Sequence, residues 1–308
     1  MRRMFLSLAA MALGVLAMPQ PSTAAEIRYD GCDIVHSTIL TPLADAFKAK
    51  TGHQLTMHFG GDGAGIKALT NRSADIGGLC RHLLETPEEK DLVMVPVAWD
   101  AVVVVVHPSN PVANLTRDQL TKIFSGKTKK WSDVGAPASL GDIHVYVRQG
   151  KKSGVGLMAR EIVFRNLDMD FPQDHVKDSS TPLELAIEKD PAGIGFTGIT
   201  SAVIRKLKMV KFEGVMPSDA SMKDGSYEVI RPLYLTFARA SAGRGVVGEF
   251  VRFALSKEGQ GIIGKAGILP ITDSSEVLWA RYYHVLEESK QDIAALKQAR
   301  KSAESMSD

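Results

Sequence analysis

Between residues 26 and 79 the apolar positions alternate between two spacings. Short stretches of alternating apolar and polar residues are typical of strands, whereas Ile39, Leu43 and Phe47 recur at the three- and four-residue spacing of a helix. The predicted order is β-α-β-α-β, which indicates a doubly wound parallel sheet whose ligands bind where loops leave the carboxyl ends of strands. The elements are strands at 26–31, 55–59 and 74–79 and helices at 38–51 and 66–70.

The pattern continues as an α/β protein through the rest of the chain. Consecutive valines at 102–106 predict a strand buried on both faces, because the run is too short to span a membrane. Thr116 is placed to cap the helix that follows it. The predicted elements are strands at 93–106, 143–147, 192–196 and 232–238 and helices at 116–124, 154–166 and 246–264.

The last segment, residues 273–308, has the character of an addition to this body. Asp273-Ser274-Ser275-Glu276 has the form of a capping box, and apolar residues then recur at helical spacing before a polar tail. We expect a C-terminal helix that either packs against the body or docks a partner.

The composition is that of a soluble globular protein. The chain has 308 residues, of which 44% are hydrophobic and 23% are charged, and this length predicts two lobes or one large α/β unit. The 37 Lys and Arg residues against 35 Asp and Glu residues give a formal charge of +2, too balanced for a nucleic-acid-binding protein. We expect a monomer with no nucleic-acid partner.

Residues 1–25 have the pattern of a secretory signal peptide. Arg2 and Arg3 precede an apolar stretch at 4–18, and small residues up to Ala25 suit cleavage there. A retained membrane anchor is the alternative. Cleavage predicts a periplasmic protein and leaves 35 basic and 35 acidic residues, because only Arg2 and Arg3 are lost. Any attraction for an anion must then be local.

Four loops at predicted strand ends combine glycine, small polar residues and arginine. Backbone N–H groups and the positive dipole end at a helix start attract anions, and Arg81 and Arg148 add permanently charged donors. A cleft between two lobes would collect all four loops. They lie at 31–38, 60–65, 79–82 and 148–154.

The sequence contains no motif for hydrolysis or nucleotide chemistry. GxSxG, HExxH and a Walker loop are absent, and the glycine run at 60–65 lacks the Lys-Ser/Thr of a phosphate-binding NTPase loop. We therefore expect a protein that is not an enzyme and that needs no cofactor.

Several motifs follow one another in a fixed order along residues 27–271. They include Asp75-Ile76-Gly77, Ile123-Phe124-Ser125-Gly126-Lys127, Trp131-Ser132-Asp133-Val134-Gly135, Ile194-Gly195-Phe196 and Arg231-Pro232-Leu233-Tyr234-Leu235. In this order they resemble the phosphate-binding proteins of ABC importers, the PstS-like periplasmic solute-binding family.

The resemblance implies a type II periplasmic-binding-protein fold. This is an α/β fold of two doubly wound lobes, joined by two crossing strands, that close over an oxyanion so that an ABC permease or a sensor protein recognises the closed shape. The crossings would lie near 97–100 and 233–237. Lobe I would comprise 26–98 plus 236–272, and lobe II would comprise 99–235.

The resemblance also implies a set of site residues, from which this chain departs in part. The family site uses hydroxyls, backbone amides and an arginine, whereas Cys32, Asp62 and Cys80 stand here where Ser is common. Asp62 repels a dianion unless it accepts the ligand's proton. We expect a small, phosphate-like oxyanion. The candidate ligand-binding residues are Cys32, Ser37, Thr38, Asp62, Gly63, Cys80, Arg81, Arg148, Ser153 and Gly154.

Both cysteines of the chain lie in these loops. The first and third strands are neighbours in such a sheet, so Cys32 and Cys80 should lie close together. An oxidising compartment favours a disulfide. The alternatives are a soft-metal or metalloid site formed by Cys32, Cys80, His36 and His82, which would make the protein a metal or redox sensor, or two thiols without a role.

Overall fold

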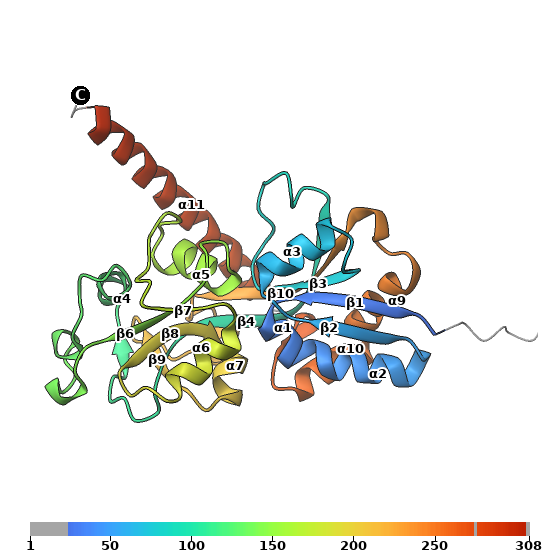
Figure 1. Cartoon of the computed structure of the whole chain (residues 1–308), viewed down its shortest axis with the longest axis horizontal. Coiled ribbons are helices and arrows are strands. Elements are labelled where there is room, and N and C mark those ends of the chain that lie inside the picture. The colour runs from blue at the N-terminus through green and yellow to red at the C-terminus, as the bar shows by residue number, and fades with distance from the viewer. Residues whose placement is uncertain (1–23, 274–275, 306–308) are drawn as a thin grey trace, which may run out of the picture.

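One mixed sheet of eleven strands runs through the molecule, and the computed structural model describes it within residues 24–273 and 276–305 (Figure 1). Its main path is β2-β1-β3-β10-β4-β8-β6-β7, and β5, β9 and β11 lie off this path. The strands are β1 (Glu26–Gly31), β2 (Gln54–His58), β3 (Ile76–Leu79), β4 (Leu92–Val106), β5 (Asn114–Leu115), β6 (His144–Arg148), β7 (His175–Lys177), β8 (Gly193–Gly198), β9 (Lys208–Phe212), β10 (Ile230–Ala238) and β11 (Leu269–Pro270).

The first half of the sheet has the β-α-β-α-β order predicted from the apolar spacing. Strand β1 is parallel to both β2 and β3, and Gly31 is paired with Gly78 where β1 and β3 end. Its helices are α1 (Asp33–Val35), which continues through a π-helical turn (His36–Leu40) into α2 (Thr41–Thr51), then α3 (Asp62–Thr70), α9 (Gly245–Leu255) and α10 (Lys257–Lys265).

Two long strands carry the chain between the halves. Strand β4 pairs with β10 along its first part and with β8 through its valines, and Val102–Val106 are almost completely buried. Strand β10 lies between β3 and β4, although about 150 residues separate it from β3. The residue limits assigned to the two lobes stay a prediction.

The second half of the sheet consists of the parallel strands β8, β6 and β7, with β4 running antiparallel beside β8. Thr116 caps α4 as predicted, because its hydroxyl accepts from the N–H of Gln119 and the Gln119 side chain accepts from the N–H of Thr116. The helices are α4 (Arg117–Phe124), α5 (Gly154–Met158), a π-helical turn (Ala159–Val163), α6 (Ser180–Ile187), α7 (Ile199–Ile204) and α8 (Asp219–Lys223). Short 3₁₀ helices lie at Trp131–Val134, Ala138–Leu140, Arg239–Ser241 and Ile271–Asp273.

The C-terminal helix α11 (Glu276–Ser305) starts against the body and then extends away from it (Figure 1). Leu278, Tyr282 and Val285 are buried, and the Trp279 ring lies 4.5 Å from that of Trp99. Packing of the helix onto the body is thus observed, while a docking role stays a prediction. Part of the predicted capping box, residues 274–275, lies outside the described residues, as do residues 1–23 of the predicted signal peptide.

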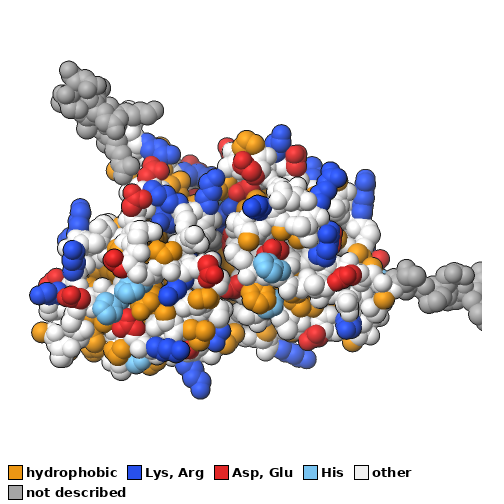
Figure 2. Space-filling model, in the orientation of Figure 1, with side chains coloured by type: hydrophobic (Ala, Val, Ile, Leu, Met, Phe, Trp, Pro, Cys, Tyr) orange, Lys and Arg blue, Asp and Glu red, His pale blue; other side chains and the backbone are white. Residues whose placement is uncertain are grey.

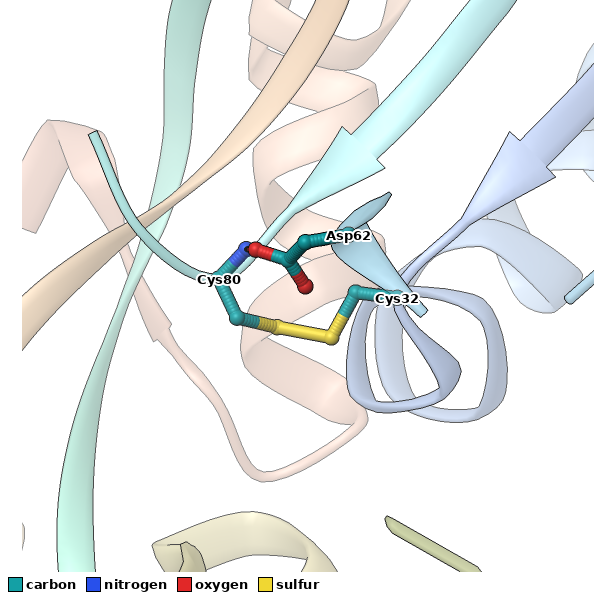
Figure 3. Close-up of side chains that lie close together, drawn as sticks. All are labelled: Cys32, Asp62 and Cys80. Atoms are coloured by element: carbon teal, nitrogen blue, oxygen red, sulfur yellow. Dashed lines mark hydrogen bonds between the residues drawn. A yellow bond between two sulfur atoms is a disulfide. The ribbon is translucent and has the colours of Figure 1, made fainter. Parts of the chain in front are cut away.

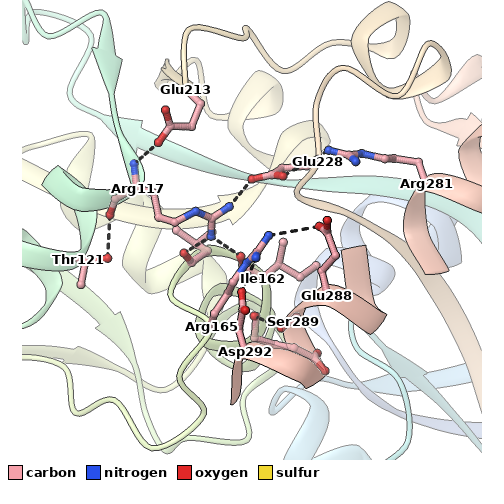
Figure 4. A network of polar contacts seen from close by, with 12 residues as sticks. Arg117, Thr121, Ile162, Arg165, Glu213, Glu228, Arg281, Glu288, Ser289 and Asp292 are labelled. Carbon is pink, nitrogen blue, oxygen red and sulfur yellow. Dashed lines mark hydrogen bonds and ion pairs between the residues drawn. The ribbon is translucent and has the colours of Figure 1, made fainter. Parts of the chain in front are cut away.

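Polar contacts fasten α11 to the second half of the sheet (Figure 4). Arg165 forms ion pairs with Glu288 and Asp292 of this helix. Glu228 accepts from Arg281 of the helix and from Arg117 of α4, so it links the two elements. Within the part of the chain that the structure describes, no helix is long and apolar enough to cross a membrane.

Four sequence predictions of helices are wrong in their limits. The helix expected over 66–70 is α3, which begins at Asp62, and the helix expected over 154–166 is α5 followed by a π-helical turn that ends at Val163. The single helix expected over 246–264 is two helices, because Ser256 leaves the helical conformation and its hydroxyl caps α10 by accepting from the N–H of Gly259 at 3.1 Å. The helix expected to begin at Thr38 begins at Asp33, directly after β1.

Acidic and basic side chains are interspersed over the face of the molecule in Figure 2.

Candidate functional site

A disulfide joins the ends of the two central strands of the first half-sheet. Cys32 follows β1, Cys80 follows β3, and their sulfur atoms are bonded, with the Cα atoms 6.3 Å apart (Figure 3). The Cys32 N–H donates to the carbonyl of Gly78 at 2.9 Å, which continues the ladder between the strands. Both cysteines are buried. The topological argument from neighbouring strands placed them together correctly.

The carboxylate of Asp62 lies beside this disulfide (Figure 3). Asp62 is the first residue of α3, it is 3% exposed, and its Oδ2 accepts from the N–H of Cys80 at 2.9 Å. Burial raises the pKa of the Asp62 carboxyl, against the opposing effects of Arg81, the Cys80 N–H and Arg148. Asp62 is therefore a buried acid held by groups from both halves of the molecule.

Arg148 and Gly154 approach Asp62 from the second half of the sheet. Arg148 ends β6, and its Nη1 and Nη2 donate to the Ser180 hydroxyl and the Asp178 carbonyl, each at 2.7 Å. A Cβ added to Gly61 would lie 2.9 Å from Arg148 Nη2, and one added to Gly154 would lie 2.5 Å from Asp62 Oδ2. We call Gly61, Asp62, Arg148 and Gly154 the junction.

Asp33 is a second acid that reaches across, and sequence reasoning missed it. Its Oδ2 accepts from the N–H of Thr181, in the first turn of α6, at 3.3 Å. Asp33 is 4% exposed, and its Oδ1 has no hydrogen-bond partner. The sequence signal for Asp33 was its place two residues after the predicted end of the first strand, because an acid there lies at the same edge of the sheet as the ligand loops.

The other buried arginines near Asp62 are already paired with acids. Arg81, predicted to bind ligand, donates to both carboxylate oxygens of Glu89, at 2.9 and 2.8 Å. Arg231 donates to Asp100 Oδ2 at 2.7 Å and to the Cys80 carbonyl at 2.9 Å. Glu89 was missed because it lies eight residues beyond Arg81 in an irregular segment.

The structure does not bring the side chains of the remaining candidates into the junction. Ser153 directly precedes Gly154 at the N-cap position of α5, but its hydroxyl donates to the carbonyl of Gly150 and does not cap the helix. Ser37 and Thr38 lie within helical turns, and their hydroxyls donate to the carbonyls of Asp33 and Ile34. Gly63 has open space around its Cα. The hydroxyls of Ser37 and Thr38 are thus engaged within their own helix.

The predicted metal set does not assemble. His36 stacks on Phe59, with ring centroids 4.3 Å apart, and His82 Nδ1 lies 3.7 Å from Glu161 Oε2. Among the described residues, the cysteines gather only Asp62, with ligand atoms within 4.8 Å of one another. Because the bridged cysteines offer no thiolate, a metal site stays a prediction for the reduced protein alone.

Comparisons with known proteins show the family to which the chain belongs. The family model described as PBP superfamily domain matches residues 20–258. Protein SphX of Synechococcus elongatus is 27% identical over 286 residues, covering 86% of this chain and 84% of its own. Phosphate-binding protein PstS of Borreliella burgdorferi is 24% identical over 247 residues, covering 76% and 88%.

A solved structure gives the same likeness in three dimensions. The structure of a putative phosphate ABC transporter substrate-binding protein with bound phosphate from Clostridium perfringens superposes with a TM-score of 0.72 at 26% identity. The match covers 80% of this chain and 99% of that one.

Proposed function

Because this chain belongs to the family of the PBP superfamily domain, we propose that it captures a small, phosphate-like oxyanion between its two lobes and presents it to an ABC permease or a sensor protein. The type II periplasmic-binding-protein fold and the PstS-like family predicted from the motifs are confirmed. The relative from Borreliella burgdorferi and the solved structure from Clostridium perfringens are named as binding proteins, which confirms the expectation that the chain is not an enzyme.

The proposal rests on the way in which loops from the two halves of the sheet meet at the junction. The start of α3 and the start of α5 meet there through Asp62 and Gly154. Arg148 lies beside Gly61, and its Nε is buried without a hydrogen-bond partner. A guanidinium N–H without a partner, beside glycines that let backbone approach closely, suits an anionic oxygen.

The proposed location is the periplasm. The predicted signal peptide supports it, and so does the Cys32–Cys80 disulfide, because structural disulfides persist in oxidising compartments.

Isothermal titration calorimetry against phosphate, sulfate, molybdate and arsenate tests the proposal. We expect a Kd below about 1 mM for at least one of them. Arg148→Met should weaken that binding at least tenfold, whereas Arg239→Met, at an exposed arginine outside the junction, should not. Absence of binding to all four anions would contradict the proposal.

The second candidate function, metal, metalloid or redox sensing, rests on the grouping of Cys32, Asp62 and Cys80. Metal analysis and thiol counting after purification under reducing conditions test it. A disulfide that resists reduction, together with unchanged anion binding in Cys32→Ser/Cys80→Ser, would reject this function.

A further inference from the structure

The two halves of the sheet are held together across the junction by carboxylates of the chain itself. Asp62 belongs to the first half, yet both its carboxylate oxygens lie against Gly154, since an added Cβ there would be 2.5 and 2.7 Å from them. Asp33, also from the first half, accepts from the N–H of Thr181 in the second. Two side-chain anions thus contact the helix starts from which an oxyanion would draw its donors.

The charges around the junction leave no surplus for a bound dianion. The cations are Arg81, Arg148 and Arg231. Arg81 forms an ion pair with Glu89, and Arg231 forms one with Asp100. Arg148 lies in the field of Asp62 and Asp33. Glu184 also acts on Arg148, so three guanidinium groups face five buried carboxylates. Adding an oxyanion to this set would place uncompensated negative charge in a low-dielectric site.

The backbone around Asp62 is suited to moving it. Gly61, directly before it, has φ +87°, and Gly63, directly after it, has open space around its Cα. Glycine on both sides removes the side-chain contacts that would otherwise fix the turn. Withdrawal of the carboxylate would break its hydrogen bond from the Cys80 N–H.

We propose that Asp62, assisted by Asp33, is a built-in anion that closes the two lobes in the absence of ligand, and that an external oxyanion enters only by displacing it. The inference rests on the proposed function, because it takes the junction to be the oxyanion site. It follows that the closed shape exists without ligand, so a permease or sensor that recognises this shape would engage the ligand-free protein. Ligand entry then replaces one closing anion by another.

The test measures lobe separation and anion affinity separately. Spin labels are attached at Lys67→Cys and Lys129→Cys, two exposed positions on opposite lobes, and pulsed electron paramagnetic resonance measures the distance between them. The natural cysteines are bonded to each other and do not react with the label. Phosphate titration calorimetry reports the affinity. The variants are Asp62→Ser, with Asp62→Asn in reserve if the serine protein does not fold, and Asp45→Ser, which removes one exposed acid from α2 as a matched control.

We expect the ligand-free wild-type protein to show a short, narrow distance distribution, and Asp62→Ser to show a longer one that phosphate shortens. Asp62→Ser should bind phosphate at least tenfold more tightly than wild type, and Asp45→Ser should match wild type in both measurements. An open ligand-free wild-type protein would overturn the inference, and so would measurable phosphate binding of equal affinity in wild type and Asp62→Ser. If Asp62→Ser opens but neither protein binds any of the four oxyanions, closure by Asp62 stands and the proposed function fails.

Discussion

Arg231 and Asp100 are direct partners in the ladder between β10 and β4, and they form an ion pair in which neither side chain has any exposed surface. Arg231 Nη2 lies 2.7 Å from Asp100 Oδ2, while Nη1 holds the carbonyl of Cys80. The pair therefore ties the strands that cross between the lobes to the disulfide loop.

Removing one member of this pair should be severely destabilising. Arg231→Met leaves the Asp100 carboxylate buried without its counter-charge, and we expect the free energy of unfolding to fall by about 3–5 kcal/mol. Denaturant titration measures it. Arg28→Met, which breaks the exposed pair with Asp75, is the control and should cost far less. Adding Asp100→Asn to Arg231→Met should restore part of the loss, and a double variant as unstable as the sum of the singles would contradict this account.

A methyl group at Gly154 should disturb the contact between the lobes. In Gly154→Ala the new Cβ and the Asp62 carboxylate cannot both keep their places, since 2.5 Å separates them. We expect a loss of about 1–3 kcal/mol in unfolding free energy, as for other overpacked sites, unless Asp62 withdraws. Gly63→Ala, with open space around it on α3, should be neutral or slightly stabilising. Equal thermal midpoints for the two alanine variants would refute the contact.

The disulfide should contribute to stability through the loop that it closes. Cys32 and Cys80 are separated by 48 positions, and a cross-link of that span is expected to add about 2–4 kcal/mol. Cys32→Ser/Cys80→Ser should lose this amount in denaturant unfolding, and a reductant should then have no further effect on it. A double-serine variant as stable as the oxidised protein would show that the bridge does not stabilise the fold.

Glu161 and His82 should give opposing dependences of stability on pH. Burial raises the pKa of Glu161 from 4.5 to about 7, so the folded protein binds the extra proton and stability falls as pH rises through that window. Burial, reinforced by Arg81, lowers the pKa of His82 from 6.5 to about 4, so there the unfolded chain binds the extra proton and stability rises with pH. The two contributions nearly cancel between pH 4.5 and 6.5.

Single variants separate these contributions. In thermal unfolding between pH 4.5 and 6.5, Glu161→Gln should become more stable as pH rises, and His82→Gln should become less stable. The wild-type protein should show a shallower dependence than either variant. Two variants with the wild-type slope would mean that neither group titrates as its burial implies.

The sequence was informative where chemistry followed from local order. Strand adjacency placed Cys32 beside Cys80, and the hydroxyl of Thr116 marked a helix start that the structure confirms. The motifs identified the family, because many residue types in one order are unlikely to recur by chance. These features depend on neighbouring strands or on contacts within a few residues.

Features that depend on contacts between the two lobes could not be predicted from the sequence. Asp62 was identified as a candidate, but its contact with Gly154 arises only when two loops 92 residues apart are brought together. Arg81 was predicted to bind ligand, whereas the structure pairs it with Glu89. The spacing of apolar residues does not show which of several acids pairs with a buried arginine, because the packing of irregular segments determines that pairing.

The disulfide turns residues 32–80 into a covalent ring that contains β2, α3 and the exposed turn at Arg72. A protease that cuts after Arg72 would cleave the backbone once without releasing a fragment, because the two pieces stay linked through sulfur. Trypsin-nicked protein should therefore migrate as one full-length band on a non-reducing gel and separate into two only after reduction.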